Sequence, residues 1–230
     1  MSETHFDVYA RNYDAALNQG ISLAGESKEY FAAARVHCLA DRLAALNAAP
    51  ARVLDFGCGT GGTCPELLRQ LDARVVLGVD PSADMVAVAR RQHHGPRVRF
   101  TTVDEMPCDG SFDVAYCNGV FHHIPPAQRL ATLARIRASL SVGGYFALWE
   151  NNPWNPGTRL VMSRIPFDRD AILVWPREAR ALLRQSGFRI VRTDFRFLFP
   201  RQLAVLRPLE RWVARVPGGA QYQVLAQKEA

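Results

Sequence analysis

Apolar residues along the first half of the chain follow two different spacings. From Glu26 to about Asn47 they recur every three or four positions, which predicts an amphipathic helix that ends before Pro50. Residues 51–57 and 73–80 are short apolar runs, typical of buried strands, and the first breaks into glycines. Helical spacing returns around 67–71 and again over 81–92, where Pro81 and Ser82 suit a helix start.

The same alternation continues to residue 151. Three more apolar runs, at 97–104, 112–119 and 143–151, predict strands, and residues 125–140 form an amphipathic pattern opened by prolines. Strands that alternate with helices imply crossover connections, so we expect an α/β fold with a parallel sheet covered by helices on both faces.

The pattern changes after residue 151. Residues 152–175 read as an irregular excursion, 176–188 as a helix closed by Gly187, and 202–216 as a helix interrupted by Pro208. Residues 188–199 and 220–228 predict two late strands, which need not run parallel to the first five.

Length and composition limit the class of protein. The 230 residues, 48% of them hydrophobic, suit one α/β domain. No leader-like segment or run long enough to span a bilayer is present, so we expect a soluble, cytoplasmic protein that is not an integral membrane protein. The five cysteines form no CxxC pair, so we expect reduced thiols and no metal site.

Positive charge is concentrated in the last third of the chain. Residues 151–230 carry a formal net charge of +8 and residues 1–150 a net charge of −2. Such an excess could attract an anionic substrate, an anionic membrane surface or nucleic acid. It could equally be a solvated arginine-rich face, and the charge alone leaves these alternatives open.

A glycine loop follows the first predicted strand. Gly57, Gly59 and Gly62 satisfy G-x-G-x-x-G, and Asp80 ends the next strand, so an NAD-dependent oxidoreductase must be considered. Three features disfavour it. Asp55 would lie beside a pyrophosphate, a further acid, Asp104, ends the third strand, and the chain has no Tyr-x-x-x-Lys pair for hydride chemistry.

Five stretches in this order resemble the class I S-adenosylmethionine-dependent methyltransferases, nearest to the small-molecule type often found in bacteria. They are "YARNYD" (9–14), "VLDFGCGTGG" (53–62), "GVDPSADMV" (78–86), "VDEMPCDGSFDVAYCNGVFHHI" (103–124) and "LSVGGYFALWE" (140–150). The resemblance implies a seven-stranded, mostly parallel Rossmann-like sheet in the order 3-2-1-4-5-7-6 with strand seven antiparallel. It also implies one domain over 1–230, with N-terminal lid helices (1–48), a cofactor-binding core (50–150) and a substrate-side part (151–230).

The resemblance also implies a cofactor site for S-adenosylmethionine, with S-adenosylhomocysteine as product. Asp80 is expected to bind the ribose hydroxyls, Met85 to pack on the adenine, and Asp104 to accept from the adenine amino group. The other implied cofactor contacts are Asp55, Gly57, Gly59, Gly61, Glu105, Asn118 and, in the N-terminal lid, Tyr13.

Two histidines follow the fourth predicted strand, where the acceptor should lie. Methyl transfer is an in-line displacement, and a neutral acceptor must lose a proton. His122 and His123 are the candidates for that task, since imidazole titrates near neutral pH. Of the two we expect His123 to face inward. A role in positioning or packing remains open for both.

The stretch "ENNPWNP" (150–156) is similar to the Asn-Pro-Pro-aromatic tetrad of amino-directed nucleic-acid methyltransferases. That tetrad follows strand four, whereas this stretch follows strand five and lacks the second proline. We expect it instead to wall the acceptor pocket, because ligands bind beyond the carboxyl ends of such strands. The predicted acceptor-binding residues are Tyr9, Glu150, Asn152, Trp154 and Arg159.

The acceptor itself is the least determined part. A small molecule is expected, with an anionic one favoured by Arg159, Arg164, Arg207 and Arg211. Three alternatives stay open: a nucleic-acid or protein methyltransferase using the basic third, an NAD oxidoreductase, and a catalytically silent cofactor-binding protein. Residues 203–216 could also contact an anionic membrane peripherally, with Trp212 at the interface. The sequence does not determine an oligomeric state.

Overall fold

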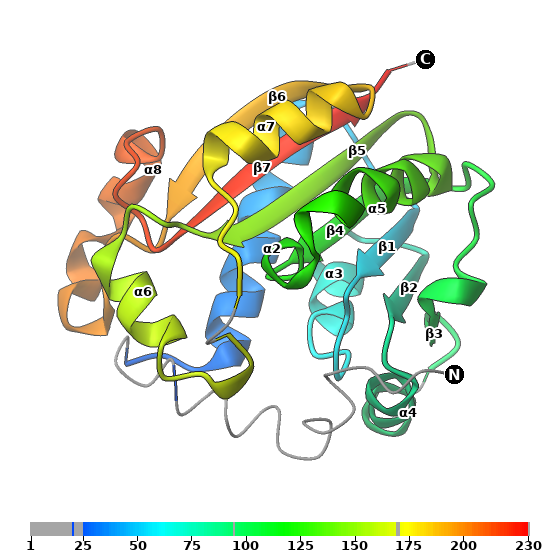
Figure 1. Ribbon diagram of the computed structural model, residues 1–230, viewed down its shortest axis with the longest axis horizontal. Helices are drawn as coiled ribbons and strands as arrows, with labels where there is room; N and C mark the ends of the chain where they lie inside the picture. Colours follow the sequence, from blue (N-terminus) through cyan, green and yellow to red (C-terminus); the bar gives the residue numbers. More distant parts are fainter. Residues whose placement is uncertain (1–19, 21–24, 94, 169–170, 230) are drawn as a thin grey trace.

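A computed structural model describes residues 20, 25–93, 95–168 and 171–229. The expected lid residues Tyr9 and Tyr13 lie outside this part of the chain. The described residues form one seven-stranded sheet with helices on both faces (Figure 1).

The sheet has the strand order that the sequence predicts, β3-β2-β1-β4-β5-β7-β6. Neighbours among the first five strands pair in parallel, whereas β7 pairs antiparallel with both β5 and β6. The arrowheads of β1 and β2 point to the same edge (Figure 1), so the loops that follow them meet there. The strands are β1 (Arg52–Phe56), β2 (Val75–Asp80), β3 (Val98–Thr102), β4 (Phe112–Asn118), β5 (Leu140–Asn151), β6 (Phe188–Arg196) and β7 (Gln221–Lys228).

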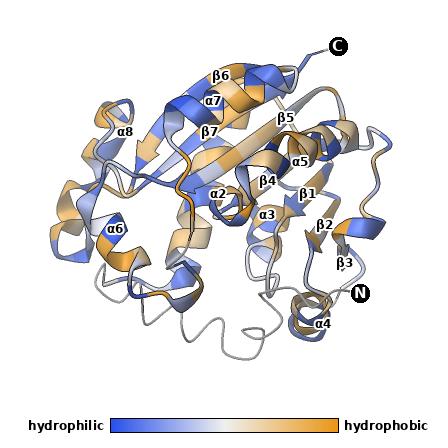
Figure 2. Cartoon of the chain, viewed as in Figure 1, coloured by the Kyte–Doolittle hydropathy of each residue, from blue (hydrophilic) through white to orange (hydrophobic). Residues whose placement is uncertain are grey.

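Helices bury an apolar cluster on each face of the sheet. One cluster contains Leu39 of α2, Leu67 of α3 and Val86 of α4, and the other contains Leu133 of α5 and Leu183 of α7. Polar and apolar residues alternate around α7, as expected for a helix with one buried face (Figure 2). The helices are α2 (Lys28–Ala45), α3 (Cys64–Gln70), α4 (Ala83–Gln92), α5 (Pro126–Ser139), α6 (Pro156–Met162), α7 (Pro176–Gln185) and α8 (Glu210–Val213).

Short 3-10 helices fill several connections at the edge where β1 and β2 end. They are η3 (Val103–Glu105), η4 (Phe121–His123) and η5 (Pro166–Asp168), and a longer one, η6 (Arg201–Leu209), precedes α8. The prediction of an irregular excursion over 152–175 was wrong in part, because α6 and η5 lie within it. The Asn155 side chain caps α6 by accepting from Thr158 N at 3.0 Å, a local signal that the apolar pattern did not include.

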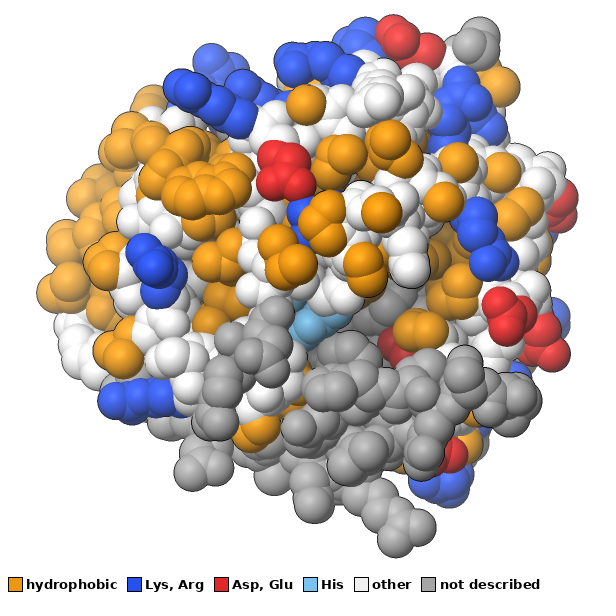
Figure 3. Space-filling model, viewed as in Figure 1, with side chains coloured by type: hydrophobic (Ala, Val, Ile, Leu, Met, Phe, Trp, Pro, Cys, Tyr) orange, Lys and Arg blue, Asp and Glu red, His pale blue; other side chains and the backbone are white. Residues whose placement is uncertain are grey.

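The predicted helix over 202–216 is mostly 3-10, with Pro208 inside it and only the four residues of α8 in α conformation. This segment exposes an apolar patch, on the left of Figure 3, made of Leu203, Val205, Leu209, Trp212 and Val216. The sequence prediction of peripheral membrane contact falls on this patch and stays a prediction. No helix in the described ranges is both long and apolar enough to cross a membrane.

Candidate active site

The loop after β1 has a backbone that only glycine adopts readily. Gly57, Gly59 and Gly61 have φ angles of 75°, 53° and 83°, all in the left-handed region. A Cβ on Gly57 would lie 2.2 Å from Val120 Cγ2, and one on Gly61 would lie 2.8 Å from the Phe100 ring. Glycine is therefore required here by both the backbone conformation and the lack of space, at the carboxyl end of β1.

Asp80 connects this loop to the helix that follows β2. Its Oδ2 accepts from Gly59 N at 2.9 Å and its Oδ1 accepts from Ser82 N at 2.9 Å. Ser82 in turn caps α4 by accepting from Met85 N at 3.1 Å. A carboxylate oxygen can accept more than one hydrogen bond, so Asp80 can hold the loop and still receive ribose hydroxyls.

Asp55 is the buried acid of this region, with 2% of its surface exposed. Burial raises its pKa to about 7, and the nearby Asp80 carboxylate acts in the same direction, although Cys64 Sγ donates to Asp55 at 3.3 Å. A cationic ligand would favour the ionised form of this carboxyl. The site thus suits a positively charged ligand better than a pyrophosphate.

The remaining predicted cofactor contacts lie around the same edge. Asp104 and Glu105 are exposed in η3 beyond β3, and Met85 is buried at the start of α4. Asn118 ends β4, and its buried Oδ1 has no hydrogen-bond partner among the described residues. An orphaned acceptor is costly unless a ligand supplies the donor, as the ammonium of a methionine moiety would. These residues fit S-adenosylmethionine.

A cavity of about 480 Å³ begins beside this site. Asn118 and Gly119 line it at one end, so it adjoins the position expected for the reactive end of the cofactor. The rest of the wall comes from elements on both sides of the edge, namely α2, η4, α6, η5, the 197–200 segment and the start of β7.

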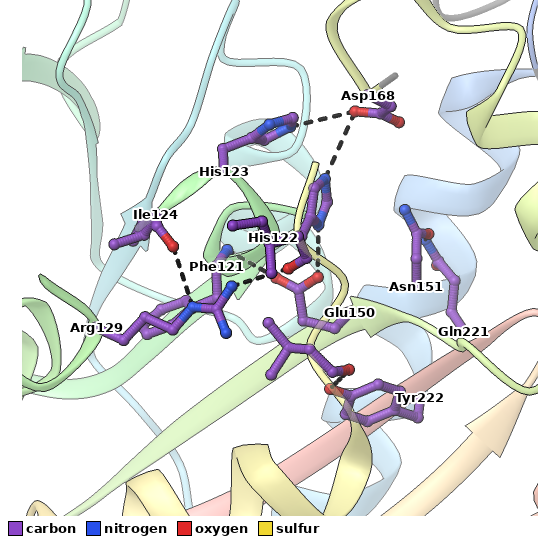
Figure 4. Close-up of polar contacts among 12 residues, drawn as sticks. Phe121, His122, His123, Ile124, Arg129, Glu150, Asn151, Asp168, Gln221 and Tyr222 are labelled. Carbon is purple, nitrogen blue, oxygen red and sulfur yellow. Dashed lines mark hydrogen bonds and ion pairs between the residues drawn. The ribbon is translucent and has the colours of Figure 1, made fainter. Parts of the chain in front are cut away.

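Both histidines line this cavity and share one carboxylate (Figure 4). His122 Nε2 lies 3.5 Å and His123 Nε2 3.2 Å from Asp168 Oδ1. On its other side, His122 Nδ1 lies 2.6 Å from Glu150 Oε2, and Glu150 Oε1 accepts from Phe121 N at 2.7 Å. His122 is therefore fixed between two carboxylates.

The two imidazoles differ in protonation. Burial opposes a charge on His122, but the carboxylates of Glu150 and Asp168 outweigh it and raise the pKa of His122 to about 10. For His123, burial lowers the pKa, and the neighbouring imidazolium also lowers it, against the raising effect of Asp168. His122 is thus held as an imidazolium at neutral pH, whereas His123 is neutral and able to accept a proton.

The same cluster has the spacing of metal ligands, since one ligand atom from each of His122, His123 and Asp168 lies within 4.8 Å of the others. An ion bound here would have to displace the proton from His122. We therefore interpret the cluster as an ion-pair network. The expectation of no metal site stays a prediction.

Several predicted acceptor residues lie away from the cavity wall. Glu150 and Asn152 are fully buried. Glu150 lies beneath His122, and the Asn152 Nδ2 donates to Pro217 O and Gly219 O at 3.1 and 2.7 Å. Trp154 packs against Trp175, with ring centroids 5.7 Å apart. None of these three lines the cavity, so their assignment to its wall is corrected.

Neighbouring residues line the cavity in their place. Asn151, Asn155 and Thr158 do so, because the chain turns sharply at Asn152 into α6. Arg159 is exposed and, like Arg164, Arg211 and Trp212, absent from the wall. Arg207 does line it, paired with Glu26 at 2.9 Å.

The sequence interpretation missed Arg35 and Gln221, which also line the cavity. A signal for Arg35 was present. It lies four residues from both Phe31 and Leu39, on the apolar face of the predicted helix, where a charge requires an explanation.

Comparisons with known proteins point to a methyltransferase domain. Residues 53–144 match a family model described as a methyltransferase domain. The trans-aconitate 2-methyltransferase of Deinococcus radiodurans is 40% identical over 98 residues, which cover 43% of this chain and 37% of that protein. The ubiquinone biosynthesis O-methyltransferase of Bradyrhizobium sp. is 39% identical over 97 residues, covering 40% and 37%. This chain thus matches well under half the length of either relative.

Among solved structures, a chain from the complex between the Haloferax volcanii Trm112 methyltransferase activator and a methyltransferase superposes with a TM-score of 0.66. The superposition covers 100% of both chains at 18% identity, so the likeness concerns the fold. The sheet order is that of the class I S-adenosylmethionine-dependent methyltransferase fold, and the glycine loop and the acids after β2 and β3 suit S-adenosylmethionine as the cofactor.

Proposed function

We propose that the protein transfers a methyl group from S-adenosylmethionine to an oxygen or nitrogen of a small molecule bound in the 480 Å³ cavity. The observation that carries this proposal is the position of the cavity. Asn118 and Gly119 line it beside the glycine loop, and side chains of α2 and α6 line it as well. Its volume is that of a small-molecule site.

The cofactor, when bound, supplies an electrophilic methyl group on a sulfonium. The protein then has to orient both reactants and exclude water. Gly57, Gly61 and Asn118 hold the methionine end, and Asp80 holds the ribose. Tyr30, Phe31 and Phe197 form an aromatic wall, with Phe31 and Phe197 edge to face at 5.0 Å, which keeps water from the acceptor.

We assign different tasks to the two histidines. His123, neutral at pH 7, accepts the proton that a hydroxyl or a neutral amine loses as its oxygen or nitrogen gains the methyl group. His122, held as an imidazolium by Glu150 and Asp168, fixes Asp168 and through it the orientation of His123. His122 is a positioning residue in this scheme.

A small acceptor is supported by the two curated relatives, whose names refer to trans-aconitate and to ubiquinone biosynthesis. A nucleic-acid acceptor is less well supported, because arginines of the basic C-terminal third have partners within the protein. Arg192 pairs with Asp194 at 2.7 Å, and Arg207 pairs with Glu26 at 2.9 Å. We further propose that the protein acts in a bacterial cytoplasm, with residues 1–48 as a lid and 151–230 on the acceptor side.

Transfer of a labelled methyl group from S-adenosylmethionine to a lysate of the source cell tests the proposal. We expect label in the small-molecule fraction, and His123→Gln should lower kcat by about 10²- to 10⁴-fold with little change in cofactor affinity. Label in RNA or protein instead would favour the macromolecular acceptor. Tight cofactor binding with no labelled product would favour the silent cofactor-binding protein.

A further inference from the structure

Arg35 is a buried cation on the wall of the proposed acceptor cavity. It lies on α2 with 8% of its surface exposed, and it lines the cavity. Its Nε donates to Tyr116 Oη at 3.2 Å and its Nη1 donates to Gln221 Oε1 at 3.0 Å. Both partners are neutral, and no carboxylate within the described residues forms an ion pair with this guanidinium.

The acidic groups of the cavity wall already have partners within the protein. Glu26 pairs with Arg207 at 2.9 Å, and Asp168 pairs with the two histidines. Glu210 accepts from the backbone N–H groups of residues 197, 198 and 199 at 3.2, 2.9 and 3.0 Å. The acids of the wall therefore do not neutralise Arg35. Asp55 interacts electrostatically with Arg35 but forms no ion pair with it. A buried cation without an ion-pair partner is costly, which favours an anion supplied by a ligand.

Amide groups continue the polar wall from Arg35 toward the cofactor site. Gln221 Nε2 donates to Asn151 Oδ1 at 3.1 Å, and Asn118 follows on the neighbouring strand β4. Gln221 and Asn151 lie side by side, to the right of the histidine cluster in Figure 4. Gln221 thus uses its oxygen on Arg35 and its nitrogen on Asn151, which fixes the guanidinium. Nη2 has no hydrogen-bond partner among the described residues and remains to donate to a ligand.

From this geometry we propose that Arg35 binds a carboxylate group of the methyl acceptor, so that the substrate class is a small organic acid. This inference rests on the proposed function of the cavity. A planar guanidinium matches a planar carboxylate. Arg35 and the Asp168–histidine cluster come from different elements of the wall, so an acceptor whose carboxylate is bound by Arg35 can extend the rest of its structure toward the histidines.

Binding to the S-adenosylhomocysteine complex tests this assignment. Calorimetry would use trans-aconitate, succinate and benzoate as probes, each paired with its neutral amide. We expect at least one carboxylate to bind and its amide to bind at least tenfold more weakly. Arg35→Gln should weaken binding of the carboxylate probe by about 10- to 100-fold, the range expected for a lost charge-assisted hydrogen bond. Arg35→Lys should recover part of the loss.

Arg42→Gln is the matched control. Arg42 lies two helical turns further along α2, pairs with Asp194 at 3.0 Å and does not line the cavity. The Arg42→Gln variant should bind the carboxylate probe with an affinity within twofold of the wild type. The inference is overturned if no carboxylate binds, if the amides bind equally well, or if Arg35→Gln has no effect.

The comparison of each acid with its amide uses the unaltered protein, so it stands even if Arg35→Gln fails to fold. Affinity for S-adenosylhomocysteine is measured separately in every variant. If the wild type did not bind S-adenosylhomocysteine, this would count against the proposed function. If it bound S-adenosylhomocysteine but bound acids and amides equally well, this would count against the Arg35 assignment alone.

Discussion

Adjacent histidines in this protein have opposite protonation preferences because their neighbours differ. His122 lies between Glu150 and Asp168, whereas His123 has Asp168 and the His122 ring, whose centroid is 4.1 Å away. The group that keeps its charge is thus the one with two carboxylates. The sequence alone did not predict which of the two histidines carries the charge.

The pH dependence of stability tests the charge on His122. Its folded-state pKa of about 10 lies above the ordinary 6.5, so its stabilising contribution is complete below pH 6.5 and is lost as pH rises through 10. Between those two pH values we expect the free energy of unfolding of the wild type to fall by at least about 1.4 kcal/mol more than that of His122→Gln. This difference corresponds to one pKa unit. Denaturant unfolding at pH 6, 8 and 10 measures it.

His37→Gln is the control for that series, because His37 is largely exposed, with 72% of its side-chain surface accessible. It should follow the wild-type pH dependence. Parallel curves for wild type and His122→Gln would show that Glu150 and Asp168 do not hold a proton on His122.

Asp80 permits a second test at the residue scale. Asp80→Ala removes the acceptor of Gly59 N and the proposed ribose contact, so S-adenosylhomocysteine affinity should fall at least tenfold by calorimetry. Asp84→Ala, an exposed acid in the first turn of α4, should leave it unchanged. Equal affinities for the wild type and Asp80→Ala would remove Asp80 from the cofactor site.

At the scale of elements, the β1–α3 loop depends on glycine for two physical reasons, its left-handed backbone and the lack of space for a Cβ. Gly57→Ala should lower the free energy of unfolding by about 1–3 kcal/mol and abolish measurable cofactor binding, since Val120 would have to move. Gly95→Ala meets no atom within 4 Å and serves as control. Unfolding curves measure the change in stability and calorimetry measures the change in cofactor affinity. Unaltered cofactor affinity in Gly57→Ala would contradict the prediction.

The turn from β5 into α6 separates a structural asparagine from one that faces the acceptor. Asn152→Ala leaves the Pro217 and Gly219 carbonyls without their donor, so it should cost about 1–3 kcal/mol of stability. Asn151→Ala should instead raise the acceptor KM with little change in melting temperature, because Asn151 lines the cavity. Thermal melts and steady-state kinetics together separate the two, and the reverse pattern would exchange these roles.

At the scale of the whole molecule, the cofactor should stabilise the folded protein. A ligand at 100 times its Kd adds about 2.7 kcal/mol, which for a chain of this size corresponds to roughly 5–10 °C in melting temperature. We expect this shift with S-adenosylhomocysteine and none with NAD, measured by thermal unfolding. A shift with NAD alone would reinstate the oxidoreductase alternative.

Much of the fold followed from local patterns. The five parallel strands and their helices were predicted within a few residues. Continuous apolar runs indicate buried strands, and apolar residues every three or four positions indicate amphipathic helices. The order 3-2-1-4-5-7-6 came from the family resemblance and was confirmed. The 152–175 and 202–216 segments were predicted less well, since α6 depends on a cap and η6 contains a proline.

The sequence by itself indicated the glycine loop and the acids that follow the strands, because each stands at a fixed place after a predicted strand, and its resemblance to the class I methyltransferases implied the cofactor. Only the tertiary structure decided the acceptor cavity. Arg35, Asn118, Asp168 and Gln221 come from four separate elements and meet only when the sheet is complete. The reason is physical. The charge state and exposure of a side chain depend on neighbours that the folded chain supplies, and these were too distant along the sequence to be paired from spacing alone.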